Sequence, residues 1–350
     1  MTAPLRPLWK QILDEVVLGN RGLIKLNGLW FPLALCLTVS PPGPAKTATA
    51  AFFLIAGAVA GWLLSAIIVN DIADRLPDGA ESGKWISRLS PAARIIVALL
   101  LTLWAWAVPV LSKAGSVAAW SLPAASAAGF LYSVQPFRLK EKGLAGIAAY
   151  SISCVLGYVV FPWAWLGVRV LTLLVLAPAV FLDKWTNLHF HQLADLDKDR
   201  RAAVRTYAVR AGLERTRRTL RRAAGLACLA LAAAPLASWI SLDPAWRLVG
   251  LSAVGAAALA ARFYTLNSRR SPTPSPLVRE LPWPYLALTH GVLRVYPLVL
   301  LARLAAGGSI AWTAGAAAAA AVGVEAISLA RSAGHLGKPP GRPPRASGRP

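Results

Sequence analysis

Nine long apolar runs, separated by short polar segments, dominate the pattern of hydrophobic and polar positions along the 350-residue chain. Each run holds roughly 17 to 23 residues, which as a helix is about the length that crosses the hydrocarbon core of a bilayer. The sequence therefore predicts an all-α polytopic membrane protein with nine transmembrane helices. The expected spans are 23–39, 48–69, 92–111, 116–132, 144–165, 168–190, 223–241, 245–264 and 283–304.

The two ends of the chain differ from this apolar middle. Residues 1–22 are polar and amphipathic, and they predict a cytoplasmic lead-in rather than a signal peptide. Residues 23–305 form the predicted transmembrane domain. Residues 306–330 predict an additional helix, a tenth, over the Ala-rich stretch 311–330. Residues 331–350 are rich in Gly, Pro and Arg, and they predict a basic, disordered tail.

Composition excludes an ordinary soluble domain. Hydrophobic residues make up 56% of the chain and charged residues only 15%. The formal net charge of +22 could suggest nucleic acid, but the 37 Lys and Arg fall mostly in the short segments between apolar runs. We therefore expect membrane lipids as partners and no nucleic acid. The three Cys lie in or beside apolar runs, with a spacing that fits neither a disulfide framework nor a zinc site.

The distribution of Lys and Arg predicts the orientation in the membrane. Segments that follow even-numbered runs hold 3, 3, 10 and 4 basic residues, over 75–88, 138–142, 198–222 and 262–279. Each segment that follows an odd-numbered run of the first nine holds one. Because Lys and Arg concentrate in cytoplasmic loops, the even-numbered segments are predicted to be cytoplasmic. We expect an integral, multi-pass protein of a bacterial inner membrane, with its active site facing the cytoplasm.

A first cluster of candidate functional residues, Asn70, Asp71, Asp74 and Asp78, follows the second apolar run in the stretch NDIADRLPD. Asn70 and Asp74 are four residues apart, so a helix places both on one face. Pro77 is expected to end this helix and to leave Asp78 on a loop. Carboxylates at the mouth of a membrane helix are costly unless the protein uses them.

A second acidic cluster, Asp195, Asp197 and Asp199, follows the sixth run. Asp195 and Asp199 again have the i, i+4 spacing, and Asp197 points away from their face. Oxygen ligands in two facing clusters suit Mg²⁺, which commonly joins one or two carboxylates to substrate phosphates, and Mn²⁺ is a candidate substitute. Either cluster alone could simply be the solvated end of a helix, without a function. That explanation is much weaker for two clusters at the same membrane face.

The sixth run also carries polar side chains within the span. Asp183 and Lys184 are adjacent, so we expect them to point in different directions on a helix and not to neutralise one another. Polar groups at this depth are expected to face a cavity rather than lipid. His189 and His191 are two residues apart and share no helix face, so a metal site at these histidines is not expected.

These motifs resemble those of a known family. NDIADRLPD resembles the NDxxDxxxD motif of the UbiA superfamily of intramembrane prenyltransferases, and Asp195 to Asp199 with Ala203, Arg205 and Thr206 is similar to its second motif. The segment YSVQPFRLK, which ends at Lys140, resembles the family's short YSxxPxRLK segment. The resemblance covers about residues 20–305. There are two departures: no Arg-Pro follows the first motif, and Ala203 replaces the usual Gly. They leave the substrate subfamily open.

The resemblance implies helices packed around a central cavity and a transferase. Its expected reaction moves a prenyl group from a polyprenyl diphosphate donor to a lipophilic or aromatic acceptor, with Mg²⁺ as cofactor. It implies catalytic roles for Asp71, Asp74, Asp195 and Asp199, metal ligation by Asn70, Asp74, Asp78, Asp195 and Asp199, and diphosphate binding by Asn70, Lys25, Arg138, Lys140 and Arg205. For Lys25, snorkelling to the interface is the plain alternative. For Arg138 and Lys140, it is the bias of basic residues toward cytoplasmic loops.

Two other functions stay open at this point. One is the transfer of a different group from diphosphate, such as phosphoribose onto a polyprenyl phosphate, which some relatives perform. The other is a cation-coupled transporter that uses the carboxylates for passage. Both acidic clusters lie at one membrane surface and neither lies at mid-membrane, which disfavours a path through the bilayer.

Overall fold

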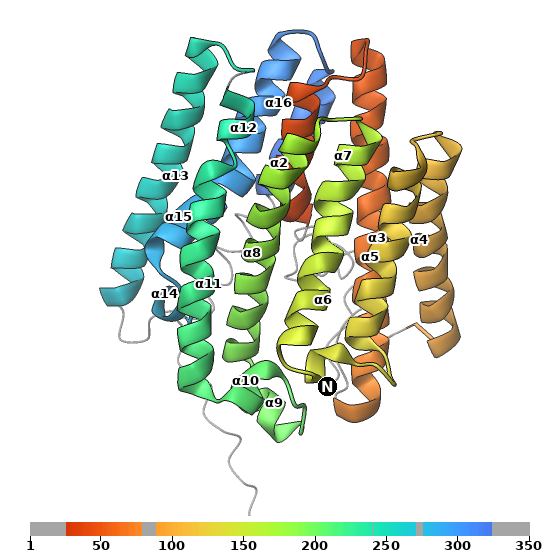
Figure 1. Ribbon diagram of the computed structural model, residues 1–350, viewed down its shortest axis with the longest axis vertical. Coiled ribbons are helices and arrows are strands. Elements are labelled where there is room, and N and C mark those ends of the chain that lie inside the picture. Colours follow the sequence, from red (N-terminus) through yellow and green to blue (C-terminus); the bar gives the residue numbers. More distant parts are fainter. Residues whose placement is uncertain (1–25, 79–88, 240, 271–275, 324–350) are drawn as a thin grey trace, which may run out of the picture.

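The computed structural model describes residues 26–78, 89–239, 241–270 and 276–323, and these ranges contain helices and no strand (Figure 1). The predicted all-α fold class is confirmed. The predicted lead-in at 1–22, Lys25 and the predicted tail at 331–350 lie outside the described residues.

The helices follow the predicted apolar runs. The first four runs correspond to α2 (Asn27–Val39), α3 (Ala45–Asp78), α4 (Pro91–Leu111) and α5 (Ser116–Ser133). The fifth run forms α6 (Leu144–Val155), the π-helical turn η5 (Leu156–Val160) and α7 (Phe161–Trp165), and the sixth forms α8 (Val170–Ala194). The last three runs form α11 (Leu213–Ala233) with α12 (Leu236–Trp239), then α13 (Pro244–Arg270), then α15 (Trp283–His290), the π-helical turn η6 (Gly291–Val295) and α16 (Tyr296–Ala306).

Short helices lie in the connections. They are η4 (Leu139–Glu141) between α5 and α6, α9 (Leu196–Arg201) and α10 (Tyr207–Ala211) after α8, and α14 (Pro276–Glu280) before α15. Seven helices or continuous helical runs in the described ranges are long and apolar enough to cross a membrane. The chain is therefore an integral, multi-pass membrane protein, and the count of nine spans stays a prediction.

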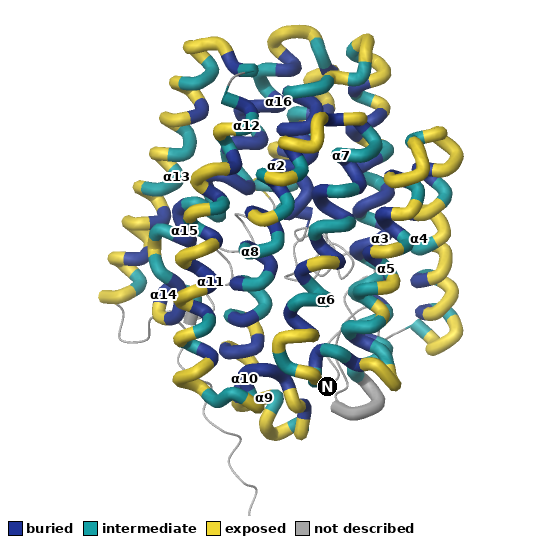
Figure 2. Tube along the Cα trace, in the orientation of Figure 1, coloured by how far each residue is buried: buried dark blue, intermediate teal, exposed yellow. Residues whose placement is uncertain are grey.

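Large apolar side chains face outward along the outer helices. On α4, Leu100 is 61% exposed, and on α13, Leu259 is 71% exposed. Figure 2 shows many exposed positions along α4 and α13, whereas buried positions gather between the helices. Such an extensive apolar surface fits contact with lipid, because a water-soluble protein rarely exposes large apolar patches.

One helix, α2, is buried on nearly all sides. Leu29, Phe31, Leu33 and Leu35 have no exposed surface. The helix packs against α16 and against the two π-helical turns, η5 and η6. A helix that is apolar all round is typical of a core position. This explains why α2, with 13 residues, forms part of the interior despite its short length.

The prediction that Pro77 ends the helix before Asp78 is wrong, because α3 continues to Asp78. Pro77 has no N–H to donate to the carbonyl of Ala73, four residues earlier. The guanidinium of Arg138 donates to that carbonyl instead, with 3.4 Å between Nη1 and the oxygen. A group from another segment thus replaces the missing helical hydrogen bond. The side chain of Asp78 lies outside what the structure describes.

The prediction that Asp183 and Lys184 do not neutralise one another is also wrong. Lys184 Nζ lies 3.1 Å from Asp183 Oδ2, and both side chains are buried. Neighbouring positions on a helix diverge by about 100°, from 3.6 residues per turn, but the long Lys stem bends back to the carboxylate. Tyr285 donates to Asp183 Oδ1 (2.9 Å), and Lys184 donates to Asn27 Oδ1 (3.5 Å). The pair therefore links α8 to α15 and α2.

A further helix begins at Trp312 and is described as far as Gly323. The N–H of Ala311 donates to Thr49 Oγ1 (2.8 Å), which ties the start of this helix to the start of α3. Ala314 and Ala318 are fully buried. The predicted tenth helix over 311–330 is thus described only in its first part, and its crossing of the membrane stays a prediction.

Candidate functional site

Three polar segments meet at one end of the helical bundle. They are the C-terminal end of α3, the connection between α5 and α6, and the connection with α9 and α10 that follows α8 (Figure 1). An ion pair between Lys140 and Asp74 joins the first two segments, and a hydrogen bond from Arg210 to the carbonyl of Glu141 (3.2 Å) joins the third segment to the second. Segments that are far apart in the sequence therefore contribute to one site.

In the first motif, Asn70 holds Asp74 in place. Its Nδ2 donates to Asp74 Oδ2 (3.0 Å), across the single helical turn that the spacing predicts. Its Oδ1 accepts a hydrogen bond from Ser133 Oγ, at the end of α5 (2.9 Å). The neighbouring Asp71 is buried, with 8% of its surface exposed. The amide thus fixes the carboxylate of Asp74 and joins α3 to α5.

The connection between α5 and α6 places two cations against Asp74. It contains a cis peptide bond between Gln135 and Pro136, and Arg138 has a left-handed backbone with φ of 34°. Lys140 forms an ion pair with Asp74 Oδ1, and Arg138 Nη2 lies 3.8 Å from the same oxygen. Both basic residues are buried. Charges act more strongly on one another when they are removed from water, so this connection sets the electrostatics of the site.

The second motif is a tight turn after α8. Asp195 ends α8, and its carbonyl accepts from the N–H of Asp199 (2.8 Å). Thr206 Oγ1 donates to Asp199 Oδ2 (3.1 Å). Ala203 has φ of 54°, a left-handed conformation that glycine adopts at lower cost. This backbone gives a physical reason for the glycine that the resembling motif usually has at the position of Ala203.

Asp199 lies in an environment that favours a bound cation. Burial raises the pKa of its carboxyl above the ordinary value, and the nearby charge of Asp195 acts in the same direction. The hydrogen bond from Thr206 and the charges of Lys198 and Lys140 act in the opposite direction and do not outweigh burial. A divalent cation would stabilise the ionised form of this carboxylate.

The remaining predicted residues lie further out or outside the described part. The side chain of Asp197 is 87% exposed and lies 3.9 Å from Arg200, so it does not join the site. Arg205 is exposed at the rim, in a pocket beside the motifs. Neither Lys25 nor the side chain of Asp78 is described. The structure therefore brings together Asn70, Asp74, Arg138 and Lys140, and it places Asp199 on the turn after α8 at the same end of the bundle.

The oxygen atoms of the site fit Mg²⁺ that is bound together with a phosphate. In the described ranges, no group of three or more His, Cys, Asp or Glu is arranged to hold a metal ion. Mg²⁺ usually binds one or two carboxylates and completes its coordination with phosphate and water oxygens. Lys140 and Arg138 already lie against the carboxylate of Asp74, which shows that this position accommodates positive charge. The donor set fits a metal whose coordination is completed by phosphate and water oxygens.

The model of the UbiA prenyltransferase family matches residues 29–279, which is most of the chain. The chain belongs to the UbiA prenyltransferase family. No curated protein matches the sequence.

Several solved structures share the fold of this UbiA-family chain. A UbiA homologue from Archaeoglobus fulgidus is 15% identical, with a TM-score of 0.55, over 85% of this chain and 98% of that one. A structure of a UbiA homologue from the same organism, bound to GPP and Mg²⁺, is 14% identical, with a TM-score of 0.52, over 80% of this chain and 96% of that one. A structure concerned with digeranylgeranylglyceryl phosphate synthase is 13% identical, with a TM-score of 0.54, over 84% and 99%.

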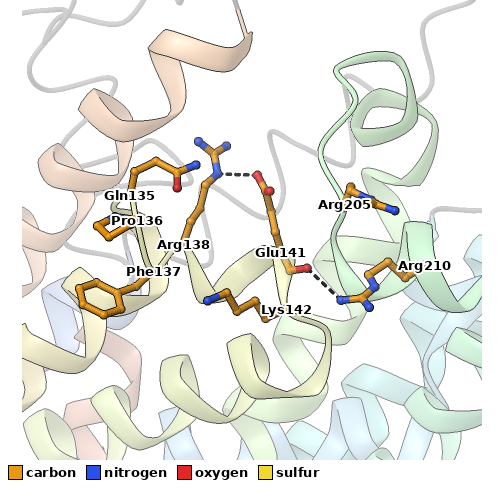
Figure 3. Close-up of a pocket in the computed structure, with 8 residues that line it drawn as sticks. All are labelled: Gln135, Pro136, Phe137, Arg138, Glu141, Lys142, Arg205 and Arg210. Carbon is orange, nitrogen blue, oxygen red and sulfur yellow. Dashed lines mark hydrogen bonds and ion pairs between the residues drawn. The ribbon is translucent and has the colours of Figure 1, made fainter.

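The sequence does not reveal every residue that shapes this UbiA-family site. Ser133 and Thr206 lie inside the motif segments, but nothing in their spacing indicates that they bond to Asn70 and Asp199. Glu141 forms an ion pair with Arg138, and its carbonyl accepts a hydrogen bond from Arg210 (Figure 3). These contacts join separate segments, so they become visible only when the chain is folded.

Proposed function

We propose that this chain transfers a prenyl group from a polyprenyl diphosphate to a lipophilic or aromatic acceptor within the membrane and releases diphosphate. The reaction requires Mg²⁺ and takes place at the cytoplasmic end of the bundle. One observation carries the proposal. Lys140 forms an ion pair with Asp74 of the first motif, and Arg210, which follows the second motif, donates a hydrogen bond to the carbonyl of Glu141, next to Lys140 (3.2 Å). Carboxylates from two neighbouring motifs together with buried cations suit a metal-bound diphosphate.

Each group at the site has a proposed role. Asn70, Asp74, Asp78, Asp195 and Asp199 hold Mg²⁺, and Asp71 supports the first motif. Bound Mg²⁺ supplies positive charge that stabilises the departing diphosphate. Lys140, Arg138, Arg205 and Lys25 bind the diphosphate oxygens. Before substrate arrives, Lys140 and Arg138 keep the Asp74 carboxylate compensated, so the site stays ordered without a ligand.

The interior of the bundle supports the second half of the reaction. Breaking the bond to diphosphate gives the allylic carbon of the prenyl group cationic character, and water would quench it. The interior of the bundle is apolar, with Phe31, Phe161 and Leu176 fully buried. An apolar interior holds a prenyl chain and excludes water until the acceptor attacks.

Related structures support the choice of donor and metal. Structures of UbiA homologues from Archaeoglobus fulgidus hold GPP with Mg²⁺ and DMAPP with Mg²⁺, and one holds Cd²⁺. We extend the use of a prenyl diphosphate and a divalent metal to this chain because the family is shared and the acidic motifs are present.

A transfer assay tests the proposal. Purified protein is incubated with radiolabelled farnesyl or geranylgeranyl diphosphate and a panel of quinone, tetrapyrrole, glycerol phosphate and carotenoid acceptors. We expect a labelled lipid product and one diphosphate released per product, both lost in excess EDTA and restored by Mg²⁺ or Mn²⁺. Full activity in excess EDTA would contradict the metal role, and absence of product with every donor would contradict prenyl transfer.

A further inference from the structure

A pocket of about 270 Å³ lies beside the acidic motifs. One wall comes from the connection between α5 and α6, and Arg205 and Arg210 form the other wall (Figure 3). The volume is just below the roughly 300–1,000 Å³ of pockets that hold drug-sized ligands. The pocket therefore suits a small ligand and not a prenyl chain.

The lining of the pocket is strongly cationic. Four basic side chains, those of Arg138, Lys142, Arg205 and Arg210, face a single carboxylate, that of Glu141. That carboxylate is engaged by Arg138, and Arg210 donates to the backbone carbonyl of the same residue (3.2 Å). The side chains of Lys142 and Arg205 make no hydrogen bond or ion pair to another described residue. Cationic charge in excess of the available carboxylate favours a multiply charged anion.

The position of the pocket connects it to the metal site. Arg138 lines the pocket and also lies 3.8 Å from Asp74, the carboxylate of the first motif. On the opposite wall, Arg205 directly precedes Thr206, which donates to Asp199 of the second motif. Lys142, Arg205 and Arg210 are exposed, so the pocket lies on the solvent side of both motifs.

We propose that this pocket is a metal-independent phosphate site that receives the diphosphate as it leaves the metal site, with Arg138 and Arg205 common to both positions and Lys142 and Arg210 specific to the pocket. The proposal rests on the proposed function, which releases diphosphate at the adjacent carboxylates. A diphosphate that has lost its prenyl group must part from bound Mg²⁺ and from buried cations before it reaches water. A cationic pocket next to that position offers the anion new partners and lowers the cost of each step.

Direct binding tests the pocket without catalysis. Binding of radiolabelled inorganic diphosphate to detergent-purified protein is measured in excess EDTA, where the two acidic motifs repel the anion. We expect near-stoichiometric binding to the wild-type protein. The double variant Lys142→Ala/Arg210→Ala should bind at least about tenfold more weakly, which corresponds to about 1.4 kcal/mol. Absence of binding in EDTA, or equal binding by the double variant, would overturn the proposal.

A matched control separates the pocket from general charge. Arg221 and Arg222 are exposed on α11 and do not line the pocket, so Arg221→Ala/Arg222→Ala removes the same charge elsewhere. We expect this control to bind diphosphate as the wild-type protein does. An equal loss of binding in the control would mean that the net charge of +22 attracts the anion without a site, and would overturn the proposal.

The phosphate of a lipid headgroup has the same chemistry, so a second comparison identifies the source. The binding measurement is repeated in nanodiscs of phosphatidylcholine alone and in nanodiscs that also contain phosphatidylglycerol. Equal diphosphate binding in both supports a route for the product. Binding that is lost only with phosphatidylglycerol would assign the pocket to an anionic lipid and overturn the release role.

Product inhibition connects the pocket to turnover. We compare the double variant with the wild-type protein. We expect the factor by which the inhibition constant of added diphosphate rises to be about ten times the factor by which the KM of the prenyl donor rises. Equal changes in both constants would overturn a separate release site. The binding measurement in EDTA does not depend on prenyl transfer, so failure of the proposed function and failure of the pocket give different results.

Discussion

Asp74 is held by Asn70 on its own helix and by Lys140 and Arg138 from another segment. Asp195, by contrast, is exposed on the turn after α8. Removal of the Asp74 side chain would leave the buried ammonium of Lys140 without its carboxylate, whereas Arg138 would keep its ion pair with Glu141. An unpaired buried charge is destabilising in its own right. Asp74→Asn keeps the shape and hydrogen-bonding capacity of the side chain, so it is the cleaner test of charge at this position.

We expect Asp195→Ala and Asp74→Asn each to lower prenyl transfer at least about hundredfold, roughly 2.7 kcal/mol in the activation barrier. The reason is the loss of a carboxylate that would hold Mg²⁺. Asp197→Ala should stay within about threefold, because its exposed side chain points away from the site. Initial rates at saturating Mg²⁺ measure the effect, and melting temperatures in detergent check folding. Equal losses at all three positions would show that the residues at the turn are wrongly assigned.

The buried pair of Asp183 and Lys184 provides a test at a position outside the motifs. Asp183→Ala leaves a buried ammonium without its carboxylate, so we expect a loss of stability of about 3–5 kcal/mol. The double variant Asp183→Ala/Lys184→Met should recover part of that loss, since it removes both charges. Thermal unfolding in one detergent measures all three proteins. A single variant as stable as the wild-type protein would mean that the pair contributes nothing.

Residue types and their spacing predict which side chains matter at the site, but not which partners they have. The spacing of Asn70 and Asp74 is local, so the sequence predicts that they share one helix face, where the structure has a hydrogen bond between them. The partners Ser133 and Lys140 come from a different segment, and only the path of the folded chain brings them close. The wrong prediction for Asp183 and Lys184 has a related cause. The helical backbone directs the two side chains apart, but the flexible side chain of Lys184 bends back to the carboxylate.

At the scale of elements, the start of α6 positions the connection that carries Lys140. A Cβ atom added to Gly146 would lie 2.3 Å from the carbonyl oxygen of Leu139 and 2.7 Å from the Cα of Lys140. Backbone atoms cannot yield as the tip of a flexible side chain can. The glycine therefore allows η4 to pack directly on α6.

We expect Gly146→Ala to displace η4, separate Lys140 from Asp74 and lower prenyl transfer at least about tenfold, while the protein remains folded. Gly129→Ala on α5 is the control, because its new Cβ would meet only Ser153 Oγ, at 3.6 Å. In that control, the helix propensity of Ala gives a neutral or slightly stabilising effect, up to about 1 kcal/mol. Activity of both variants is compared at matched protein concentration. Full activity in Gly146→Ala would show that the position of η4 does not control the site.

The length of an apolar run predicts that a helix is present, but it does not predict the residues at which the helix begins and ends. Leu213 begins α11 about ten residues before the apolar run that predicts it, because a basic, amphipathic segment extends the helix beyond the hydrocarbon core. At the first acidic motif, Arg138 donates a hydrogen bond to the carbonyl of Ala73, and α3 continues past Pro77 to Asp78. The start of α11 depends on a polar segment and the end of α3 on a group from another segment, so a pattern of apolar positions misplaces both ends.

At the scale of the whole molecule, charge and architecture agree. The polar segments at 138–142 and 198–210 lie at the same end of the bundle as the acidic motifs, and the short turn between α4 and α5 lies at the other end (Figure 1). The bias of Lys and Arg predicts that the end with the motifs is cytoplasmic. A diphosphate made in the cytoplasm would then reach the site directly from water, while the prenyl chain enters the apolar interior.

The last prediction concerns the path of the C-terminal part across the membrane. The helix that begins at Trp312 starts beside Thr49, at the end of α3 opposite the first motif. At about 1.5 Å per residue, the stretch 311–330 is long enough to cross roughly 30 Å of hydrocarbon and return the chain to the cytoplasmic side. The segment beyond it contains Arg331, Lys338, Arg342, Arg345 and Arg349 and no acidic residue, which favours the cytoplasm.

We therefore expect a cysteine at Ser347 to resist an impermeant thiol reagent added to intact cells, in a background without Cys36, Cys154 and Cys228. Ser112→Cys, at the exposed end of α4, is the control and should react readily, because its turn is predicted to face outward. Reaction at both positions would restore nine spans with an external tail. Reaction at Ser347→Cys with protection at Ser112→Cys would reverse the orientation and place the acidic motifs outside. Protection at Ser347→Cys alone, with labelling after permeabilisation, would support ten crossings and a cytoplasmic active site.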